Sequence, residues 1–250
     1  MQFTSIIQEF LKARSLMRFT PGAALIDMDG TLYDSMPGHA CAWQRMMQEI
    51  GVEISYSEMF LHEGRTGAAT IDLFIRRAFG RPATETEKRD LYRRKTELFA
   101  AMPPVNPMPG AAEMLRFLEA VNIKRVLVTG SGQSTLLNRL DTDFPGAFAA
   151  DMRVTSRDVT HGKPHPEPFL KAMQKAGVTP DRSIAIENAP LGVESAHASG
   201  AFTIGVTTGP VPAEALRKAG ADVVFGSMQQ CADSLPLLVY GFLTTMNNYN

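Results

Sequence analysis

Two aspartates close an apolar segment and are separated by a single residue. The sequence reads LIDMDGTL over Leu25–Leu32, so Asp27 and Asp29 follow a short apolar run and precede a glycine and a threonine. At the carboxyl end of a strand, side-chain alternation points both carboxylates the same way, where one hard divalent cation can bridge them. A carboxylate so placed can attack phosphorus to form an aspartyl phosphate, while the second one transfers a proton. Taken alone, the motif also fits a calcium loop or an ordinary strand end.

A second polar cluster, Thr129-Gly130-Ser131, follows the apolar segment Arg125–Thr129 and precedes a segment of helical periodicity. Hydroxyl groups, a glycine backbone and the free N–H groups of a helix N-terminus together form an anion site. We therefore expect Thr129, Gly130 and Ser131 to hold a phosphate. Helix capping by Ser131 or Ser134 is the alternative use of these residues.

A lysine lies in a proline-restricted loop with the sequence Gly162-Lys163-Pro164-His165-Pro166. The prolines on either side of His165 limit the backbone and hold Lys163 on a stiff segment. Its ammonium group would neutralise a phosphoryl group during transfer. A surface lysine in a proline turn is the alternative.

The strand-like segment Ser183–Glu187 ends in Glu187 and is followed by Asn188. Carboxylate and amide oxygens suit a hard cation, so both side chains are candidate metal ligands beside Asp27 and Asp29. Because an amide carries no charge, another residue has to supply the missing negative charge.

Short apolar runs alternate with helical periodicity along most of the chain. This alternation predicts an α/β fold, a doubly wound parallel Rossmann-like sheet whose ligands lie outside the carboxyl ends of the strands. The predicted strands are Ala23–Met28, Arg125–Thr129, Met152–Thr155, Ser183–Glu187, Thr203–Thr207 and Asp222–Phe225, and the predicted helices are Gln133–Leu140, Glu167–Ala176, Gly192–Ser199 and Ala213–Ala219.

Residues 35–107 contain helical patterns and no convincing strand, and a structureless loop of that length is not expected. We predict an inserted α-helical cap domain there, with residues 1–34 and 108–250 forming the core domain. Within residues 1–20, Ile6, Ile7, Phe10 and Leu11 predict an added amphipathic helix. The apolar stretch Leu235–Met246 is too short to span a bilayer and predicts a terminal docking helix.

Composition limits the partners of the chain. Its 250 residues include 25 basic and 26 acidic ones, giving a net charge of -1, which provides no general field for nucleic acid or an acidic membrane. Cys41 and Cys231 form no spaced pair, so neither a disulfide framework nor a zinc ribbon is indicated. We expect a cytoplasmic protein, a monomer or weak homodimer, that binds a small phosphorylated substrate.

These motifs, in this order and spacing, resemble those of the haloacid dehalogenase superfamily, in the subclass that includes β-phosphoglucomutase and small phosphatases. The matching segments are DMDGTLYDS, VTGSG, GKPHPEPF and IENAPLGVESAHASG. The resemblance implies a magnesium-dependent enzyme with Asp27 as nucleophile and Asp29 as acid/base. It also implies that Thr129 and Lys163 hold phosphate and that Asn188 binds Mg²⁺. That family usually has an acidic pair where this chain has Glu187-Asn188.

The cap segment Leu61–Ala69, LHEGRTGAA, is similar to the substrate loop of β-phosphoglucomutases. Glu63 and Gly67 stand where those mutases have a lysine and an arginine, and a carboxylate does not bind a phosphate dianion. Arg65 remains available for an anion, and His39 matches a histidine at the mutase hinge.

If the cap closes, Glu63 can restore the negative charge that is missing at Asn188. The alternative for Glu63 is an exposed helix-end carboxylate. The segments HEGRTGA and IENAPLGVE resemble a bacterial inorganic pyrophosphatase of this subclass, so we predict pyrophosphate hydrolysis. The alternatives are a β-phosphoglucomutase, which converts β-glucose 1-phosphate to glucose 6-phosphate, or a small sugar-phosphate phosphatase.

Overall fold

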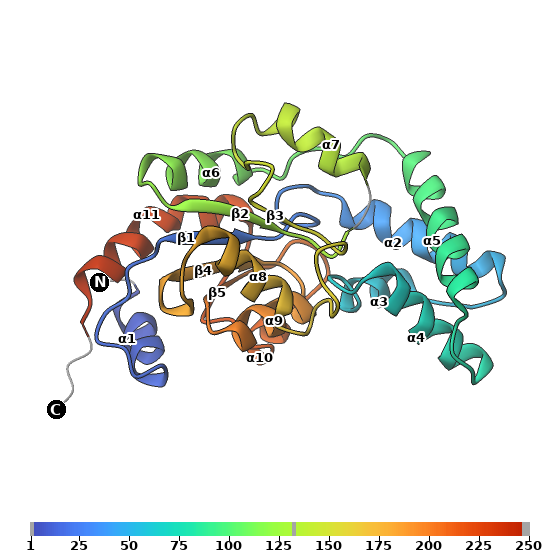
Figure 1. The fold of residues 1–250 in the computed structure, drawn as a ribbon, viewed down its shortest axis with the longest axis horizontal. Coiled ribbons are helices and arrows are strands. Elements are labelled where there is room, and N and C mark those ends of the chain that lie inside the picture. Colours follow the sequence, from blue (N-terminus) through green and yellow to red (C-terminus); the bar gives the residue numbers. More distant parts are fainter. Residues whose placement is uncertain (1–2, 132–133, 247–250) are drawn as a thin grey trace.

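Six parallel strands form one sheet at the centre of the part of the chain that the computed structural model describes, residues 3–131 and 134–246 (Figure 1). The strand order is β3-β2-β1-β4-β5-β6, so the chain moves outward from β1 to β3 and then returns to β4 on the other side of β1. The order therefore reverses between β1 and β4, and a doubly wound sheet binds its ligands at such a switch point. The strands are β1 (Ala23–Ile26), β2 (Lys124–Val128), β3 (Arg153–Val154), β4 (Ser183–Glu187), β5 (Phe202–Val206) and β6 (Val223–Phe225).

Alternate residues of the central strand pack on opposite faces of the sheet. Ala24 and Ile26 belong to an apolar cluster that includes residues of α1, α6 and α11, whereas Ala23 and Leu25 pack in a second cluster with α8 and α9. Both faces of β1 are thus covered, which explains why it has no polar residue before Asp27. The core helices are α1 (Thr4–Ala13), α6 (Ala111–Ala120), α7 (Ser134–Asp143), α8 (Glu167–Ala176), α9 (Pro190–Ser199), α10 (Ala213–Lys218) and α11 (Met228–Thr244), with a short 3₁₀ turn at Pro180–Arg182.

A cap of four helices is inserted between β1 and β2 and lies beside the carboxyl ends of the strands (Figure 1). It has its own apolar core, which includes Trp43, Met46 and Phe74. Thr66 caps the fourth helix of the chain by accepting the N–H of Ala69 at 3.3 Å, which fixes where the preceding loop ends. The cap helices are α2 (Met36–Glu49), α3 (Tyr56–Leu61), α4 (Gly67–Phe79) and α5 (Glu85–Ala100).

The two segments that join cap and core run side by side. The Met108 N–H donates to the Leu32 carbonyl at 2.8 Å, and the Asp34 N–H donates to the Asn106 carbonyl at 3.0 Å. These backbone bonds tie both connections together at the edge of the active crevice.

The predicted fold class is confirmed, with differences at the level of single elements. β1 ends at Ile26, two residues earlier than predicted, and α11 begins at Met228 rather than at Leu235. Helix α6 was not predicted, and Gln133, the predicted start of α7, lies outside the described residues. The predicted amino-terminal helix is present as α1, with Ile7 and Phe10 buried.

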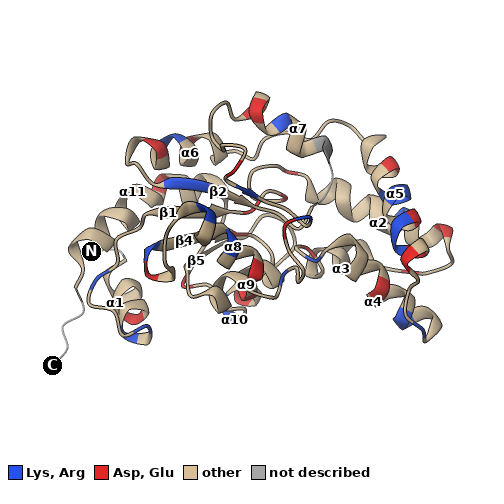
Figure 2. Ribbon diagram, viewed as in Figure 1, with Lys and Arg blue, Asp and Glu red and all other residues tan. Residues whose placement is uncertain are grey.

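Acidic and basic residues are interspersed over the helices rather than gathered by sign (Figure 2). Several form exposed pairs on the cap, such as Arg94 with Glu49 at 2.7 Å and Arg81 with Glu87 at 2.6 Å. Exposed pairs of this kind contribute little to stability, because water and salt screen them. None of the described helices is both long enough and apolar enough to cross a membrane.

Candidate active site

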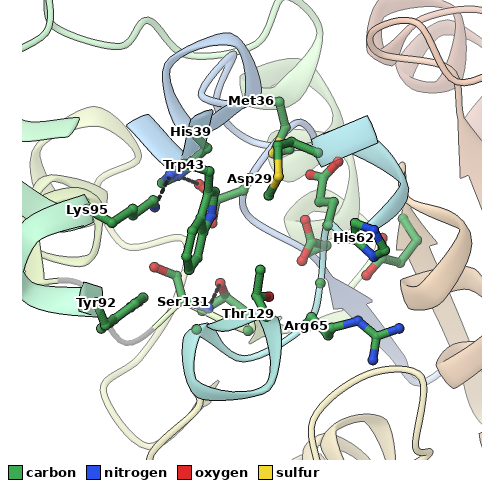
Figure 3. A pocket seen from close by; sticks show the side chains of 18 residues that line it. Asp29, Met36, His39, Trp43, His62, Arg65, Tyr92, Lys95, Thr129 and Ser131 are labelled. Carbon is green, nitrogen blue, oxygen red and sulfur yellow. Dashed lines mark hydrogen bonds and ion pairs between the residues drawn. The ribbon is translucent and has the colours of Figure 1, made fainter. Parts of the chain in front are cut away.

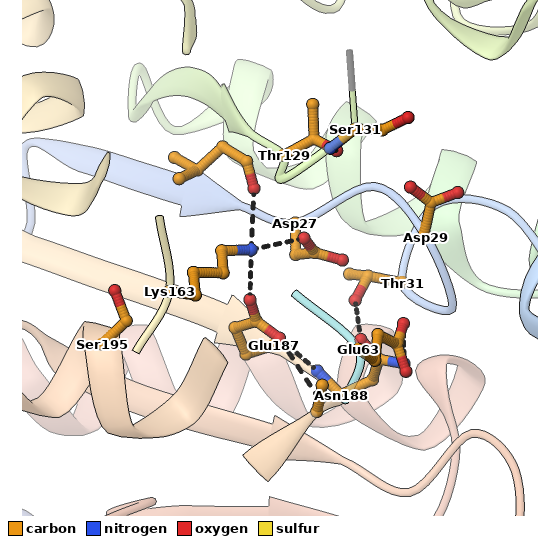
Figure 4. Close-up of polar contacts among 12 residues, drawn as sticks. Asp27, Asp29, Thr31, Glu63, Thr129, Ser131, Lys163, Glu187, Asn188 and Ser195 are labelled. Carbon is orange, nitrogen blue, oxygen red and sulfur yellow. Dashed lines mark hydrogen bonds and ion pairs between the residues drawn. The ribbon is translucent and has the colours of Figure 1, made fainter. Parts of the chain in front are cut away.

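Lys163 is the centre of a buried polar cluster at the switch point of the sheet (Figure 4). Its Nζ donates to Asp27 Oδ1 at 2.6 Å, to Glu187 Oε1 at 2.5 Å and to the carbonyl of Val128 at 3.0 Å. Its side chain is 1% exposed, so the alternative of a surface lysine is wrong. The ammonium group joins the ends of β1, β2 and β4, which is where charge on a transferring phosphoryl group would develop.

Glu187 holds Lys163 in place. Its Oε1 accepts from Lys163, and its Oε2 accepts the backbone N–H groups of Asn188 and Ala189 at 3.0 and 3.2 Å. Gly192 makes room for this carboxylate, because a Cβ at that position would lie 2.0 Å from its Cδ. Both oxygens are engaged, so these contacts favour a positioning role for Glu187. Its predicted role as a metal ligand stays a prediction.

Asp29 lies against His39 of the cap (Figure 3). Its Oδ1 accepts from Ser35 Oγ at 2.7 Å and lies 2.9 Å from His39 Nε2. On its other side, His39 Nδ1 lies 2.7 Å from Lys95 Nζ, and the imidazole stacks on Phe99 with ring centroids 4.0 Å apart. A continuous hydrogen-bonded chain thus runs from α5 through α2 to the second aspartate.

Burial and mutual contacts determine the protonation states of these three hydrogen-bonded side chains. Burial and the neighbouring Lys95 lower the pKa of His39, so the neutral ring donates from Nε2 to Asp29 and accepts at Nδ1. Burial removes the ammonium of Lys95 from water and lowers its pKa to about 7. Its Nζ lies 5.3 Å from the ring centroids of both Trp43 and Phe99. Although burial opposes ionisation of Asp29, its contacts with His39 and Ser35 hold the pKa of this carboxyl below the usual value. Asp29 is therefore a carboxylate, ready to accept a proton.

Glu63 reaches from the cap into the core cluster. Its Oε1 accepts from Asn188 Nδ2 at 2.9 Å, and Asn188 Oδ1 accepts from Thr31 at 3.3 Å. Glu63 is 8% exposed, so the alternative of an exposed helix-end carboxylate is wrong. Its Oε2 is buried and has no hydrogen-bond partner among the described residues. Burial and the neighbouring Asp27 raise the pKa of Glu63 well above its usual value.

A pocket of about 70 Å³ lies between cap and core and is lined by Asp27, Asp29, His39, Glu63, Lys95 and Glu187 among others. Thr129, Gly130 and Ser131 line its core side, and the N–H of Ser131 donates to Thr129 Oγ1 at 3.0 Å. Arg65 lines the cap side, and its buried Nε has no hydrogen-bond partner in the described part of the chain. The structure therefore brings Thr129, Gly130, Ser131 and Arg65 to one small cavity, together with His39 and Asp27. Lys163, the other predicted phosphate-binding residue, is not part of its lining and contacts Asp27 from behind.

Residues 21–200 match the family model of haloacid dehalogenase-like hydrolases. The chain belongs to this family. It is 29% identical over 207 residues to hexitol phosphatase A of Escherichia coli, covering 82% of this chain and 91% of the relative. It is 27% identical over 197 residues to the β-phosphoglucomutase of Bacillus subtilis, covering 75% and 84%. A solved structure from Bacteroides vulgatus, described as a β-phosphoglucomutase candidate, is 42% identical and covers 96% of this chain and 98% of its own, with a TM-score of 0.93.

The chain is thus a phosphatase or phosphotransferase of the haloacid dehalogenase-like family. The activities in these relatives' names are those of a hexitol phosphatase and a phosphoglucomutase. They support phosphoryl transfer and do not show the predicted resemblance to a pyrophosphatase. The choice of substrate therefore has to be argued from the site.

The cluster fits the Mg²⁺ that this family implies. Burial and the neighbouring Glu187 raise the pKa of Asp27 to about 8, and Glu63 has an orphaned buried oxygen. Buried carboxyl groups that repel one another need a further cation, and carboxylate and amide oxygens are the ligands that Mg²⁺ prefers. Asp27, Glu63 and Asn188 would hold it with their side chains, and Asp29 with its backbone carbonyl, which leaves the carboxylate of Asp29 free.

The loop of the cap lies so close to the core that side chains are excluded between them. A Cβ on Gly130 would lie 2.5 Å from the carbonyl oxygen of Gly64. We predict that Gly130→Ala keeps the fold but lowers kcat/KM about 10–100-fold, because the cap cannot close fully. Steady-state kinetics with circular dichroism would test this, with Gly226→Ala as the control, since its Cβ would meet only the flexible end of Gln230 at 3.2 Å. Equal kinetics for the two variants would contradict a requirement for this approach.

Lys95 and Ser35 complete the site and were not predicted from the sequence. Lys95 lies among exposed charged residues of α5, in ETEKRDLYRRKTELFA, where only one side of the helix faces the cap core. The helical period places it with Tyr92 and Phe99, which is the one signal that separates it from its neighbours. Ser35 directly precedes α2, where a serine is normally interpreted as a helix cap.

Lys95→Met is predicted to lower activity and raise stability. Lys95 is half neutral near pH 7, whereas a lysine in the unfolded chain is fully charged, so folding costs free energy at every pH below about 10. Removing that cost should stabilise the protein by about 1–3 kcal/mol at pH 7. Loss of the contact to His39 should lower kcat about 10–100-fold. Urea unfolding and a pH–rate profile would measure both, and a variant with unchanged kcat would show that Lys95 has no part in turnover.

Proposed function

We propose that this protein hydrolyses inorganic pyrophosphate with the help of Mg²⁺, through an aspartyl phosphate on Asp27. The observation that carries the proposal is the hydrogen bond between Glu63 of the cap and Asn188 of the core, 2.9 Å long and buried. With the cap in this position the site holds one more carboxylate and little free space. A substrate bound there therefore has to be small.

The size of the pocket supports the same conclusion. Its volume is about 70 Å³, whereas pockets for drug-sized ligands measure roughly 300–1,000 Å³. A hexose phosphate would force Glu63 out of the cluster, while pyrophosphate places its second phosphate near Arg65 without a sugar ring to accommodate. Arg65 is suited to that phosphate, because its buried Nε lacks a partner.

Four side chains of the site then have a role in the proposed reaction. Asp27 attacks one phosphorus, forming the acyl-phosphate O–P bond as the bridging P–O bond breaks and the second phosphate leaves. Lys163 and Thr129 stabilise the charge on the transferred group. Asp29 then accepts a proton from the water that attacks the aspartyl phosphate, and Asp27 is regenerated. When bound, Mg²⁺ supplies charge neutralisation of the phosphate oxygens and of the carboxylate cluster.

The protonation of Asp29 also favours this substrate. A phosphate leaves as a stable anion, whereas a sugar alkoxide has to be protonated as it leaves. His39 and Ser35 keep Asp29 ionised, so it has no proton to give to a leaving group in the first step. An anhydride substrate needs only the base.

A β-phosphoglucomutase is the second candidate function. The chain of contacts from Lys95 through His39 to Asp29 couples the acid/base residue to the cap, which suits an enzyme that has to exclude water until a sugar is bound. The likeness to the Bacillus subtilis mutase and the Bacteroides vulgatus structure points the same way. Sugar-phosphate hydrolysis, as in the hexitol phosphatase, is the remaining alternative.

A substrate comparison tests the proposal. The purified protein with Mg²⁺ would be assayed on pyrophosphate, hexose phosphates, phosphoglycolate and nucleoside monophosphates, and the substrates ranked by kcat/KM. We expect pyrophosphate to exceed every sugar phosphate by at least ~100-fold, a preference worth about 2.7 kcal/mol of transition-state binding. Conversion of β-glucose 1-phosphate to glucose 6-phosphate with little phosphate release would instead establish the mutase.

A further inference from the structure

Three potential metal ligands lie together on the outer side of the loop that carries Lys163. His161, His165 and Glu167 each offer one ligand atom, and these atoms all lie within 4.8 Å of one another. Lys163 points inward from the same loop and is 2% exposed, while His161 and His165 are exposed. This loop thus places Lys163 in the active site on its inner side and the three potential ligands on its outer side.

The cluster is held by the backbone around it. Glu167 accepts the N–H groups of Thr160 and His161 at 2.9 and 2.8 Å, and its Oε2 lies 3.2 Å from His161 Nδ1. The N–H of Glu167 donates to His165 Nδ1 at 3.2 Å, and Ser195 of α9 donates to the carbonyl of His165 at 2.6 Å. The two imidazole rings lie 4.7 Å apart, centroid to centroid. Little rearrangement is therefore needed to bring the three side chains onto one ion.

The chemistry of the three ligands selects a type of metal. Two imidazoles and a carboxylate suit Zn²⁺, Cu²⁺, Ni²⁺ or Co²⁺, whereas Mg²⁺ prefers oxygen ligands. Zinc bonds of about 2.0 Å place tetrahedral ligand atoms about 3.3 Å apart, close to the 3.2 Å already found between His161 Nδ1 and Glu167 Oε2. The bonds from the two N–H groups lower the pKa of Glu167 to about 2, so its carboxylate is ionised at neutral pH. Lys171 competes from one side, with its Nζ 3.1 Å from Oε1, and leaves Oε2 to the histidine.

We propose that His161, His165 and Glu167 form a binding site for a divalent transition-metal ion of the Zn²⁺ class, and that the bound ion clamps the loop carrying Lys163. The site is separate from the carboxylate cluster that would hold Mg²⁺, because the three side chains lie on the exposed side of the loop. A bound ion would join the segment before Lys163, through His161, to the segment after it, through His165 and Glu167. The ion therefore stiffens the segment that delivers the lysine to Asp27 and Glu187.

Zinc titration in excess Mg²⁺ tests the site directly. Isothermal titration calorimetry of the full chain is expected to show one Zn²⁺ per chain with micromolar affinity. His161→Asn and His165→Asn should each weaken binding at least tenfold, because asparagine can keep the hydrogen bonds of Nδ1 but is a poor ligand for zinc. His197→Asn, in a histidine outside the cluster, is the matched control and should bind as the wild type does.

Amide hydrogen exchange provides a second measurement that does not depend on catalysis. Zinc should slow exchange across residues 159–166 in the wild type and in the control, and should leave it unchanged in the double variant of His161 and His165. The site is disproved if the wild type binds zinc no more tightly than millimolar, or if the double variant binds it equally well. Binding without slower exchange would disprove the clamp. Neither result depends on whether pyrophosphate is the substrate.

Discussion

Asp27→Asn is expected to lower phosphate release at least ~1,000-fold at saturating Mg²⁺. The amide that replaces the carboxylate cannot form the acyl phosphate, so the covalent route is lost and not merely slowed. Asparagine keeps an oxygen that can accept from Lys163, which now makes its 2.6 Å bond to Asp27 Oδ1. The variant should therefore fold, and its thermal unfolding would confirm this beside the phosphate assay.

Asp34→Asn is the matched control for this prediction. This variant also replaces an aspartate by asparagine, but Asp34 is exposed and lies in the segment that joins the core to the cap. We expect its turnover to stay within twofold of the wild type. Trifluoroberyllate, which mimics a phosphoryl group on a carboxylate, should bind the wild type and not Asp27→Asn. Residual turnover of the variant within tenfold of the wild type would exclude attack by Asp27.

The sheet could be predicted from the sequence because each strand carries its own signal. Ser183–Glu187 is buried throughout and is bounded by a proline turn and by polar residues, and its predicted ends agree with β4. β1 ends at Ile26, although the N–H of Asp27 still donates to the carbonyl of Ile186 in β4 at 3.0 Å. From Met28 onward the backbone bonds belong to a loop, because the Met28 carbonyl accepts the N–H groups of Leu32 and Tyr33. Tertiary contacts of this kind have no local pattern, so element ends are less predictable than elements.

Helix α6 shows a different limit. Its apolar residues Met114, Leu115 and Leu118 have helical spacing, but the proline cluster before Gly110 dominates the same region. Gly110 adopts a φ of +90° immediately before the helix, close against the backbone of Gln229. A turn that is needed for packing against α11 thus conceals the start of the helix.

The core half of the active site could be predicted, and the cap half only in part. Asp27, Lys163 and Asn188 follow strand ends, and parallel strands bring their carboxyl ends together. Lys95 is brought to His39 by the packing of α5 on α2, and no rule of sequence spacing connects residues 56 positions apart. Glu63 was a candidate through its chemistry, because a missing charge at Asn188 required a partner.

Glu63→Gln is expected to lower kcat/KM for pyrophosphate by about 100–1,000-fold and to weaken Mg²⁺ binding by about 10–100-fold. Glutamine retains an acceptor oxygen for Asn188 Nδ2, so the cap can still close, but the negative charge is lost. Activity on a hexose phosphate should change less than tenfold, because such a substrate displaces this side chain. The measurements are kcat/KM for both substrates and the Mg²⁺ dependence of the rate.

Glu53→Gln, the same change at an exposed cap position, is the control and should behave as the wild type. Equal loss on both substrates would mean that Glu63 serves catalysis generally rather than selecting pyrophosphate. Full activity of Glu63→Lys on pyrophosphate would remove the basis of the proposal.

Without Mg²⁺, Glu63→Gln should be more stable than the wild type, although it is expected to be less active. The pKa of Glu63 in the folded protein is raised above its value of 4.5, so the unfolded chain releases a proton that the folded one retains. The contribution of Glu63 to stability therefore falls as pH rises above about 4.5, up to its folded-state pKa. Glutamine has no such proton, so metal-free Glu63→Gln should be the more stable protein at pH 8, and the difference should vanish near pH 4. Urea unfolding in a chelator at both pH values would measure it. A carboxylate that destabilises the empty site but is needed for turnover is expected where selection has favoured a negative charge that binds a cation.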